Sequence, residues 1–111
     1  MAKVFFMKEP TQLVTLHRPF RGSTRTIIMR PNGKVVVPVK RTHGLATWLL
    51  EPGRYIAVTI HKPKWQRLYE VTVQCLEFNN GERIVLSEVV FHSMGVSRSA
   101  IHEWVTACGG Q

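Results

Sequence analysis

Short apolar stretches rich in β-branched residues recur along the chain, and turn sequences containing Gly, Pro or Asn separate them. Within each stretch, apolar and polar positions roughly alternate, which is typical of strands that bury one face. The pattern predicts about six short, mostly antiparallel strands, at residues 3–7, 13–17, 24–30, 34–40, 54–61 and 68–78.

Two Asn-Gly sequences mark the clearest turns. Pro31-Asn32-Gly33 separates two β-branched runs and predicts a hairpin, because Asn and Gly readily adopt the positive φ angles of tight turns. Asn79-Asn80-Gly81 predicts a second hairpin in the same way. Pro38 has no N–H to donate, so it indicates an edge position or a bulge, on a strand that Lys34 and Lys40 would line.

The pattern changes after Gly81, where turn residues become fewer. Ile101, Trp104 and Val105 recur at helical spacing behind Ser97, which is a good N-cap residue, so a helix is expected at about 97–107. The fold class expected is therefore α+β and mostly β. It would be a small antiparallel sheet or open barrel of five to seven strands with a C-terminal helix, in a single domain spanning residues 1–111.

Residues 86–105 resemble the helix-turn-helix of DNA-binding regulators. Gly95 stands at the turn, Ser97 opens the second helix, and Ile101 and Trp104 stand where that helix would pack back. The resemblance implies that the second helix enters the major groove and that such a protein forms a dimer. Its base-reading side chains would be Arg98, Ser99 and His102. The alternative is a strand at 84–92 followed by one amphipathic helix packed on the sheet.

Charge changes the picture most. The chain contains fifteen Lys and Arg residues and seven acidic residues, which gives a net charge of +8. Ten of the fifteen basic residues lie within residues 1–55. A basic protein of this kind is suited to polyanions, nucleic acid above all. The cations of the first half expected to contact phosphates are Arg18, Arg21, Arg25, Arg30, Lys34, Lys40 and Arg41.

Two turn segments also mix aromatic residues with cations. Phe20 follows Arg18 in the first segment, and Trp65 lies within the second, which adds the nucleic-acid-binding candidates Lys62, Lys64 and Arg67. Aromatic platforms beside cations are what single-strand binders use, since every base has a π-face. Alternatively, Phe20 and Trp65 are core residues at strand starts.

Catalysis and cofactors find little support. The chain contains no aspartate, which argues against carboxylate clusters for metal ions and against glycosidase chemistry. The five histidines lack metal-ligand spacing, and Cys75 and Cys108 are too few for a disulfide scaffold. We expect no metal, no cofactor and no enzymatic activity. An alternative is a metal-free ribonuclease that resembles small bacterial toxins. In it, His17 or His43 would act as the general base, and Arg18, Arg21 and Arg41 would bind the phosphate.

The sequence thus favours a small basic protein that binds nucleic acid and has an accessory or regulatory role. By analogy, phages and plasmids encode small proteins of this kind. Another class remains open, an inhibitor or adaptor that engages an acidic partner protein through a strand edge or the 34–40 face. A homodimer is a further option. No apolar run reaches the roughly 18 residues of a membrane helix, and the start lacks a signal peptide, so a cytoplasmic location without membrane contact is expected.

Overall fold

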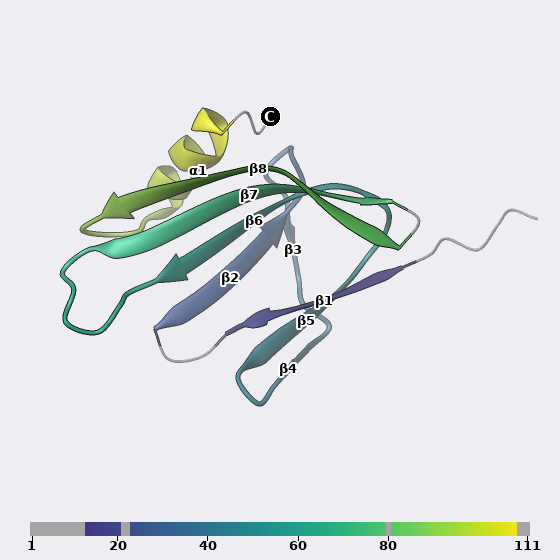
Figure 1. The fold of residues 1–111 in the computed structure, drawn as a ribbon, viewed down its shortest axis with the longest axis horizontal. Coiled ribbons are helices and arrows are strands. Elements are labelled where there is room, and N and C mark those ends of the chain that lie inside the picture. Colours follow the sequence, from purple (N-terminus) through teal and green to yellow (C-terminus); the bar gives the residue numbers. More distant parts are fainter. Residues whose placement is uncertain (1–12, 21–22, 80, 109–111) are drawn as a thin grey trace, which may run out of the picture.

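The computed structural model describes residues 13–20, 23–79 and 81–108, which form eight strands followed by one helix (Figure 1). The elements are β1 (Val14–Pro19), β2 (Thr24–Met29), β3 (Val35–Val36), β4 (Lys40–Thr42), β5 (Leu45–Leu50), β6 (Gly53–His61), β7 (Tyr69–Asn79), β8 (Glu82–Ser93) and α1 (Arg98–Ala107). The strands make a three-stranded sheet in the order β1-β5-β4 and a five-stranded sheet in the order β3-β2-β6-β7-β8. All strand pairs are antiparallel.

The mostly β, antiparallel fold with a C-terminal helix is therefore confirmed, but the division into two sheets is not what the sequence predicted. Pro38 lies between β3 and β4, so the run expected as one strand at 34–40 splits between the two sheets. Both pieces are edge strands, which suits a residue without an N–H. The described residues form eight strands rather than five to seven. The split of 34–40, the unpredicted β5 and β8, which was expected only as an alternative at 84–92, add to the five predicted strands that are described. The strand expected at 3–7 lies outside the described residues.

Tight turns connect neighbouring strands where the sequence predicted hairpins. The Gly33 N–H donates to the Arg30 carbonyl at 2.8 Å and closes the β2–β3 turn, and Asn79 of β7 faces Glu82 of β8. His43 and Gly44 join β4 to β5 with φ of 56° and 78°. Two successive positive φ angles are the signature of a two-residue turn that matches strand twist.

One core fills the space between the two sheets. Its largest member, Trp48, is 1% exposed and donates from Nε1 to the Val36 carbonyl at 2.9 Å, which joins the small sheet to the large one. The buried residues around it are Leu16, Ile28, Ala46, Leu50, Tyr55, Ala57, Leu76 and Phe78. Two short sheets with alternating inward residues thus bury a single layer of side chains between them.

A second core lies on the opposite face of the large sheet, under α1. Val105 of the helix is buried against apolar side chains of β2, β6 and β7, and Trp104 stacks on Phe91 of β8 with ring centroids 5.9 Å apart. The Ser97 hydroxyl accepts from the Ala100 N–H at 3.1 Å, as expected of an N-cap. No helix in the described residues is long and apolar enough to cross a membrane.

The segment that resembles a helix-turn-helix is a strand followed by a helix. Residues 86–93 belong to β8, where Val89 and Val90 pair with Val73 and Thr72 of β7. The two-helix arrangement that the resemblance implies over residues 86–105 is therefore wrong, and the alternative, a strand followed by one helix packed on the sheet, is confirmed. The reason is that β-branched residues favour a pleated strand, and α1 buries its apolar face on the sheet rather than on another helix.

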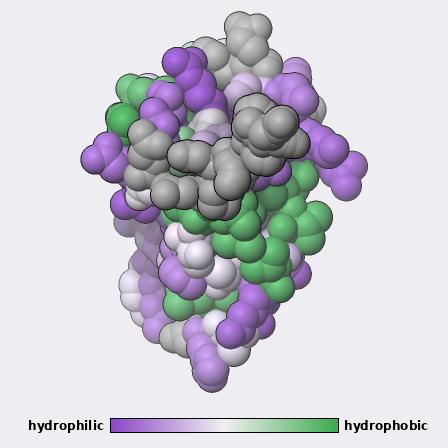
Figure 2. Space-filling view, turned by 90° about the vertical axis from the view of Figure 1, so that its right-hand side faces the viewer, coloured by the Kyte–Doolittle hydropathy of each residue, from purple (hydrophilic) through white to green (hydrophobic). Residues whose placement is uncertain are grey.

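β8 forms the outer edge of the large sheet, and its residues 82–90 are all exposed. Apolar residues on it remain accessible, with Ile84 43%, Val85 47%, Leu86 44% and Val90 44% exposed. Figure 2 views the end of the molecule where β7 turns into β8 and shows apolar surface gathered there. A long strand edge with this much apolar surface is uncommon in a soluble protein.

Candidate functional site

Trp65 is the most unusual residue of the surface. It lies in the loop between β6 and β7 and is 94% exposed. The Gln66 N–H donates to the Pro63 carbonyl at 3.1 Å, so Trp65 occupies the third position of a turn, with φ of 70°. That position favours Gly, and a left-handed conformation costs other residues about 1–2 kcal/mol. Strain that presents a large aromatic side chain to solvent is a mark of a binding site.

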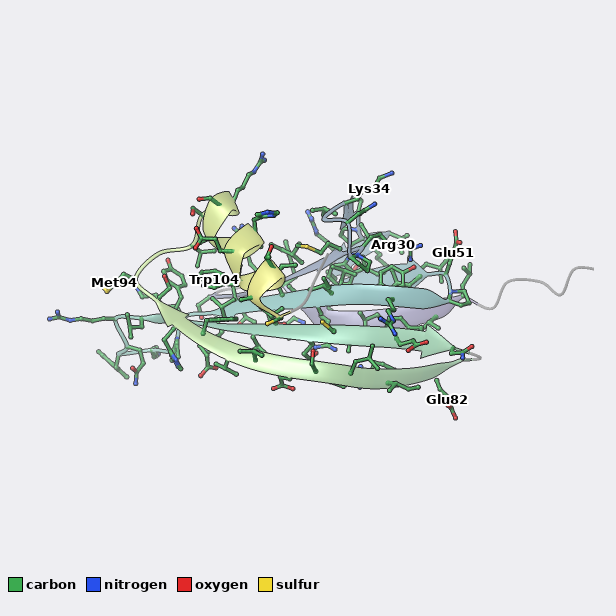
Figure 3. The ribbon with its side chains drawn as sticks, turned by 90° about the horizontal axis from the view of Figure 1, so that it is seen from above. Arg30, Lys34, Glu51, Glu82, Met94 and Trp104 are labelled. Carbon is green, nitrogen blue, oxygen red and sulfur yellow. The ribbon has the colours of Figure 1, made fainter. Side chains whose placement is uncertain are left out.

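Cations surround this tryptophan. Lys62, Lys64 and Arg67 share its loop, and residues 61–69 contain no carboxylate. Glu70 follows, and its carboxylate lies 3.9 Å from His92. Glu51 and Glu82 lie at the opposite end of the molecule from Met94, which follows β8 (Figure 3). The β6–β7 loop is therefore cationic.

A hollow of about 390 Å³ adjoins the loop. Ile60, Tyr69 and Val96 give it apolar walls, while Arg25, Lys62 and Ser23 supply polar groups. The Lys62 ammonium lies 5.3 Å from the centroid of the Tyr69 ring. The hollow thus combines apolar surface with two cations, which suits a flat ligand that carries negative charge. We call this hollow together with residues 62–68 the loop site.

Phe20 extends the loop site toward the small sheet. The Arg41 guanidinium lies 4.4 Å and that of Arg25 5.9 Å from the ring centroid, and Arg25 also lines the hollow. Phe20 is half-buried and packs against the core between the sheets. The alternative that Phe20 and Trp65 are core residues is therefore partly correct for Phe20 and wrong for Trp65. Seven residues selected from the sequence form this contiguous group: Phe20, Arg25, Arg41, Lys62, Lys64, Trp65 and Arg67.

Arg18 serves the interior rather than the loop site. Its guanidinium donates to Gln74 Oε1 at 3.3 Å, and Gln74 in turn donates to Glu88 Oε1 at 3.0 Å. Burial and the nearby Arg83 lower the pKa of Arg18, while Glu88 acts in the opposite direction. The side chain thus connects β1 with β7 and β8 across the space beside the small sheet.

The other predicted phosphate contacts lie apart from one another. Arg30 and Lys34 lie at the end opposite Met94 (Figure 3), and the Arg30 guanidinium covers the Tyr55 ring at 4.7 Å. Lys40 belongs to β4 at the edge of the small sheet. Arg21 lies outside the described residues. The six described cations of this set therefore do not converge on one face.

The residues expected to read bases lie at the start of α1. Arg98 and His102 line a second hollow, of about 520 Å³, between the helix and the β2–β3 hairpin. The walls of this hollow are mostly apolar and include Ile27 and Met29. The Ser99 hydroxyl lies 3.2 Å from that of Ser97, at the beginning of the helix.

His17 and Arg18, two residues of the ribonuclease alternative, point to opposite faces of the small sheet. His17 Nδ1 lies 3.0 Å from the Thr47 hydroxyl on the outer face of the small sheet, whereas Arg18 points inward, because neighbouring strand residues alternate faces. His43 sits in the β4–β5 turn. Within the described ranges, no group of three or more His, Cys, Asp or Glu side chains could hold a metal ion.

Four of the residues that line the hollow were not selected from the sequence: Ser23, Ile60, Tyr69 and Val96. They come from the β1–β2 connection, from the facing ends of β6 and β7, and from the segment before α1. Of these four, only Tyr69 could have been selected from the sequence, because it is an aromatic residue next to the basic loop. The others become neighbours through strand pairing alone.

Replacing Trp65 with glycine is expected to raise the free energy of unfolding by about 0.5 kcal/mol. Glycine relieves a left-handed strain of about 1–2 kcal/mol and loses about 0.5–1 kcal/mol through its greater freedom in the unfolded chain. Urea unfolding of both proteins measures the difference. Trp65→Ala, which keeps the strained φ, should stay within about 0.5 kcal/mol of the wild type. A loss of stability in Trp65→Gly would mean that the indole is packed against the protein.

No protein-family model and no curated protein matches this sequence. Among solved structures, the chain is similar to an engineered protein whose crystal structure was a Northeast Structural Genomics Consortium target, with a TM-score of 0.60 and 17% sequence identity. The match covers 72% of this chain and 59% of the engineered protein, less than two thirds of its length. At this identity the likeness concerns the fold alone.

Proposed function

We propose that the protein binds single-stranded nucleic acid through the loop site, as a non-enzymatic accessory protein in the cytoplasm. The observation that carries this proposal is the exposure of Trp65 at 94% on a strained turn, among three cations of the same loop. Both the indole and the cations would contribute to such binding. The indole offers a flat apolar surface, and the cations offer partners for phosphates.

The chemistry of binding follows from the positions of these groups. A base stacks on the Trp65 indole, while phosphates on either side contact Lys62, Lys64 and Arg67. The adjoining hollow takes a neighbouring base between its apolar walls, with Arg25 beside the backbone. Stacking accepts any base because every base has a π-face, so little sequence preference is expected.

Single strands suit this site better than duplex. A protruding tryptophan needs an unstacked base, and in a duplex the bases are already stacked on one another. Unstacking one duplex step costs a few kcal/mol, so duplex of the same length should bind more weakly. The cations give affinity for either form, but only the single strand uses the indole as well.

The test is the affinity of Trp65 variants for a labelled single-stranded oligonucleotide, measured by fluorescence polarisation. Trp65→Ala should weaken binding at least about fivefold, because stacking contributes about 1–3 kcal/mol per base. Trp65→Phe keeps a π-face and should retain most of the affinity. Met94→Ala is the matched control, since Met94 is 73% exposed near the same end of the sheet. Equal affinity of Trp65→Ala and wild type would refute the proposal.

A further inference from the structure

Among the described residues, no strand pairs with the outer edge of β8, and this edge is not part of the loop site. The strand has twelve residues, which at about 3.3 Å per residue makes an edge roughly 40 Å long. It contains no Pro or Lys, the residues that commonly protect strand edges. A bulge opposite Cys75 and Leu76 interrupts it, and residues 87–93 then pair with β7 without a break. Within the part of the chain that the structure describes, this edge is open to a further strand.

Apolar side chains occupy both faces of this edge. Val85 and Val90 face the side of the small sheet, because they pair with Leu76 and Thr72, whose side chains share the face of the core residue Phe78. Ile84 and Val89 face the side of α1, since Val89 pairs with Val73 of the second core. A strand added to β8 would therefore meet apolar neighbours above and below the sheet.

Charge indicates what this added strand is. Arg83 and Glu88 lie on the same face of β8, because they pair with Phe78 and Gln74, so antiparallel pairing of two β8 edges can place Arg83 of each copy opposite Glu88 of the other. β8 contributes Glu82, Glu88 and Arg83, a local charge of −1 with His92 neutral. The other outer strand of the large sheet, β3, has only two residues. The outer strands of the small sheet are basic, β4 with Lys40 and Arg41 and β1 with Arg18.

We infer that two copies of this chain pair antiparallel through β8 and join their five-stranded sheets into one continuous sheet. A two-fold axis brings the same strand of each copy together, so the apolar residues of one copy meet those of the other. Because the paired strands run in opposite directions, the two loop sites lie at opposite ends of the dimer. The pairing does not depend on the proposed function.

The test is sedimentation velocity over a concentration series, with two lysine substitutions on the edge. The wild type should form a concentration-dependent dimer. Val85→Lys combined with Val90→Lys should raise the dissociation constant of that dimer about tenfold or more, because four changed side chains meet across the interface. Hydrogen exchange should show protection of the β8 amides that grows with protein concentration.

Leu45→Lys combined with Leu49→Lys is the matched control. Leu45 and Leu49 are 42% and 47% exposed on the outer face of β5, the central strand of the small sheet. The two lysine substitutions add the same charge as those on β8. The control should dimerise like the wild type. A monomeric wild type, including one that pairs β8 only with a different protein, would overturn the inference. An edge variant that dimerises like the wild type, or a control that dissociates as much as the edge variant, would do the same.

Discussion

Replacing Trp48 with alanine is expected to lower the free energy of unfolding by about 3–5 kcal/mol. The side chain is 1% exposed and is the largest in the core between the two sheets. Its removal leaves a cavity and an unpaired Val36 carbonyl, since the Trp48 Nε1–H donates to that oxygen at 2.9 Å. Small domains are stable by only about 5–15 kcal/mol, so this one change removes a large share. Urea unfolding followed by far-ultraviolet circular dichroism measures the loss.

Leu49→Ala is the control for this prediction. Leu49 is the next residue of β5 and is 47% exposed on the outer face of the same sheet, so its truncation should cost about 0.5 kcal/mol or less. A Trp48→Ala protein with nearly wild-type stability would show that the two sheets are not held together by this core.

Neutralising the loop cations is the change expected to affect binding most. Each phosphate contact on a single strand adds about 0.7 to the slope of log affinity against log salt. Contacts from Lys62, Lys64, Arg67 and Arg25 predict a wild-type slope of about −2.8, and glutamine at the first three predicts about −0.7. If both proteins bind equally near 1 M salt, the triple variant binds about fiftyfold more weakly at roughly 0.15 M. Fluorescence polarisation across a salt series gives both slopes.

A second triple variant separates the loop from the charge of the whole protein. Lys34→Gln, Lys40→Gln and Arg54→Gln remove the same total charge from exposed cations outside the loop site. This variant should keep a slope close to the wild-type value. Equal losses in the two triple variants would mean that affinity follows net charge rather than the loop.

Several features of the fold could be predicted from short stretches of sequence. The alternating runs of β2, β6 and β7, the turn at Gly33 and the capped helix after Ser97 each depend on residues close together in the chain. Backbone conformation responds to such neighbours, because β-branched residues, glycine and capping hydroxyls act within a few positions. The local sequence also pointed to the basic loop around Trp65 as a candidate site.

The tertiary structure decided where these pieces meet. Pro38 divides one predicted strand between two sheets, and residues 86–93 pair with β7 instead of forming a helix. Strand pairing also brings Arg25 beside Phe20 and Lys62, while it turns Arg18 inward to Gln74. The composition of the chain determined its positive charge. The register between distant strands determined which cations share a surface, because that register depends on burying both sheet faces at once and not on any single segment.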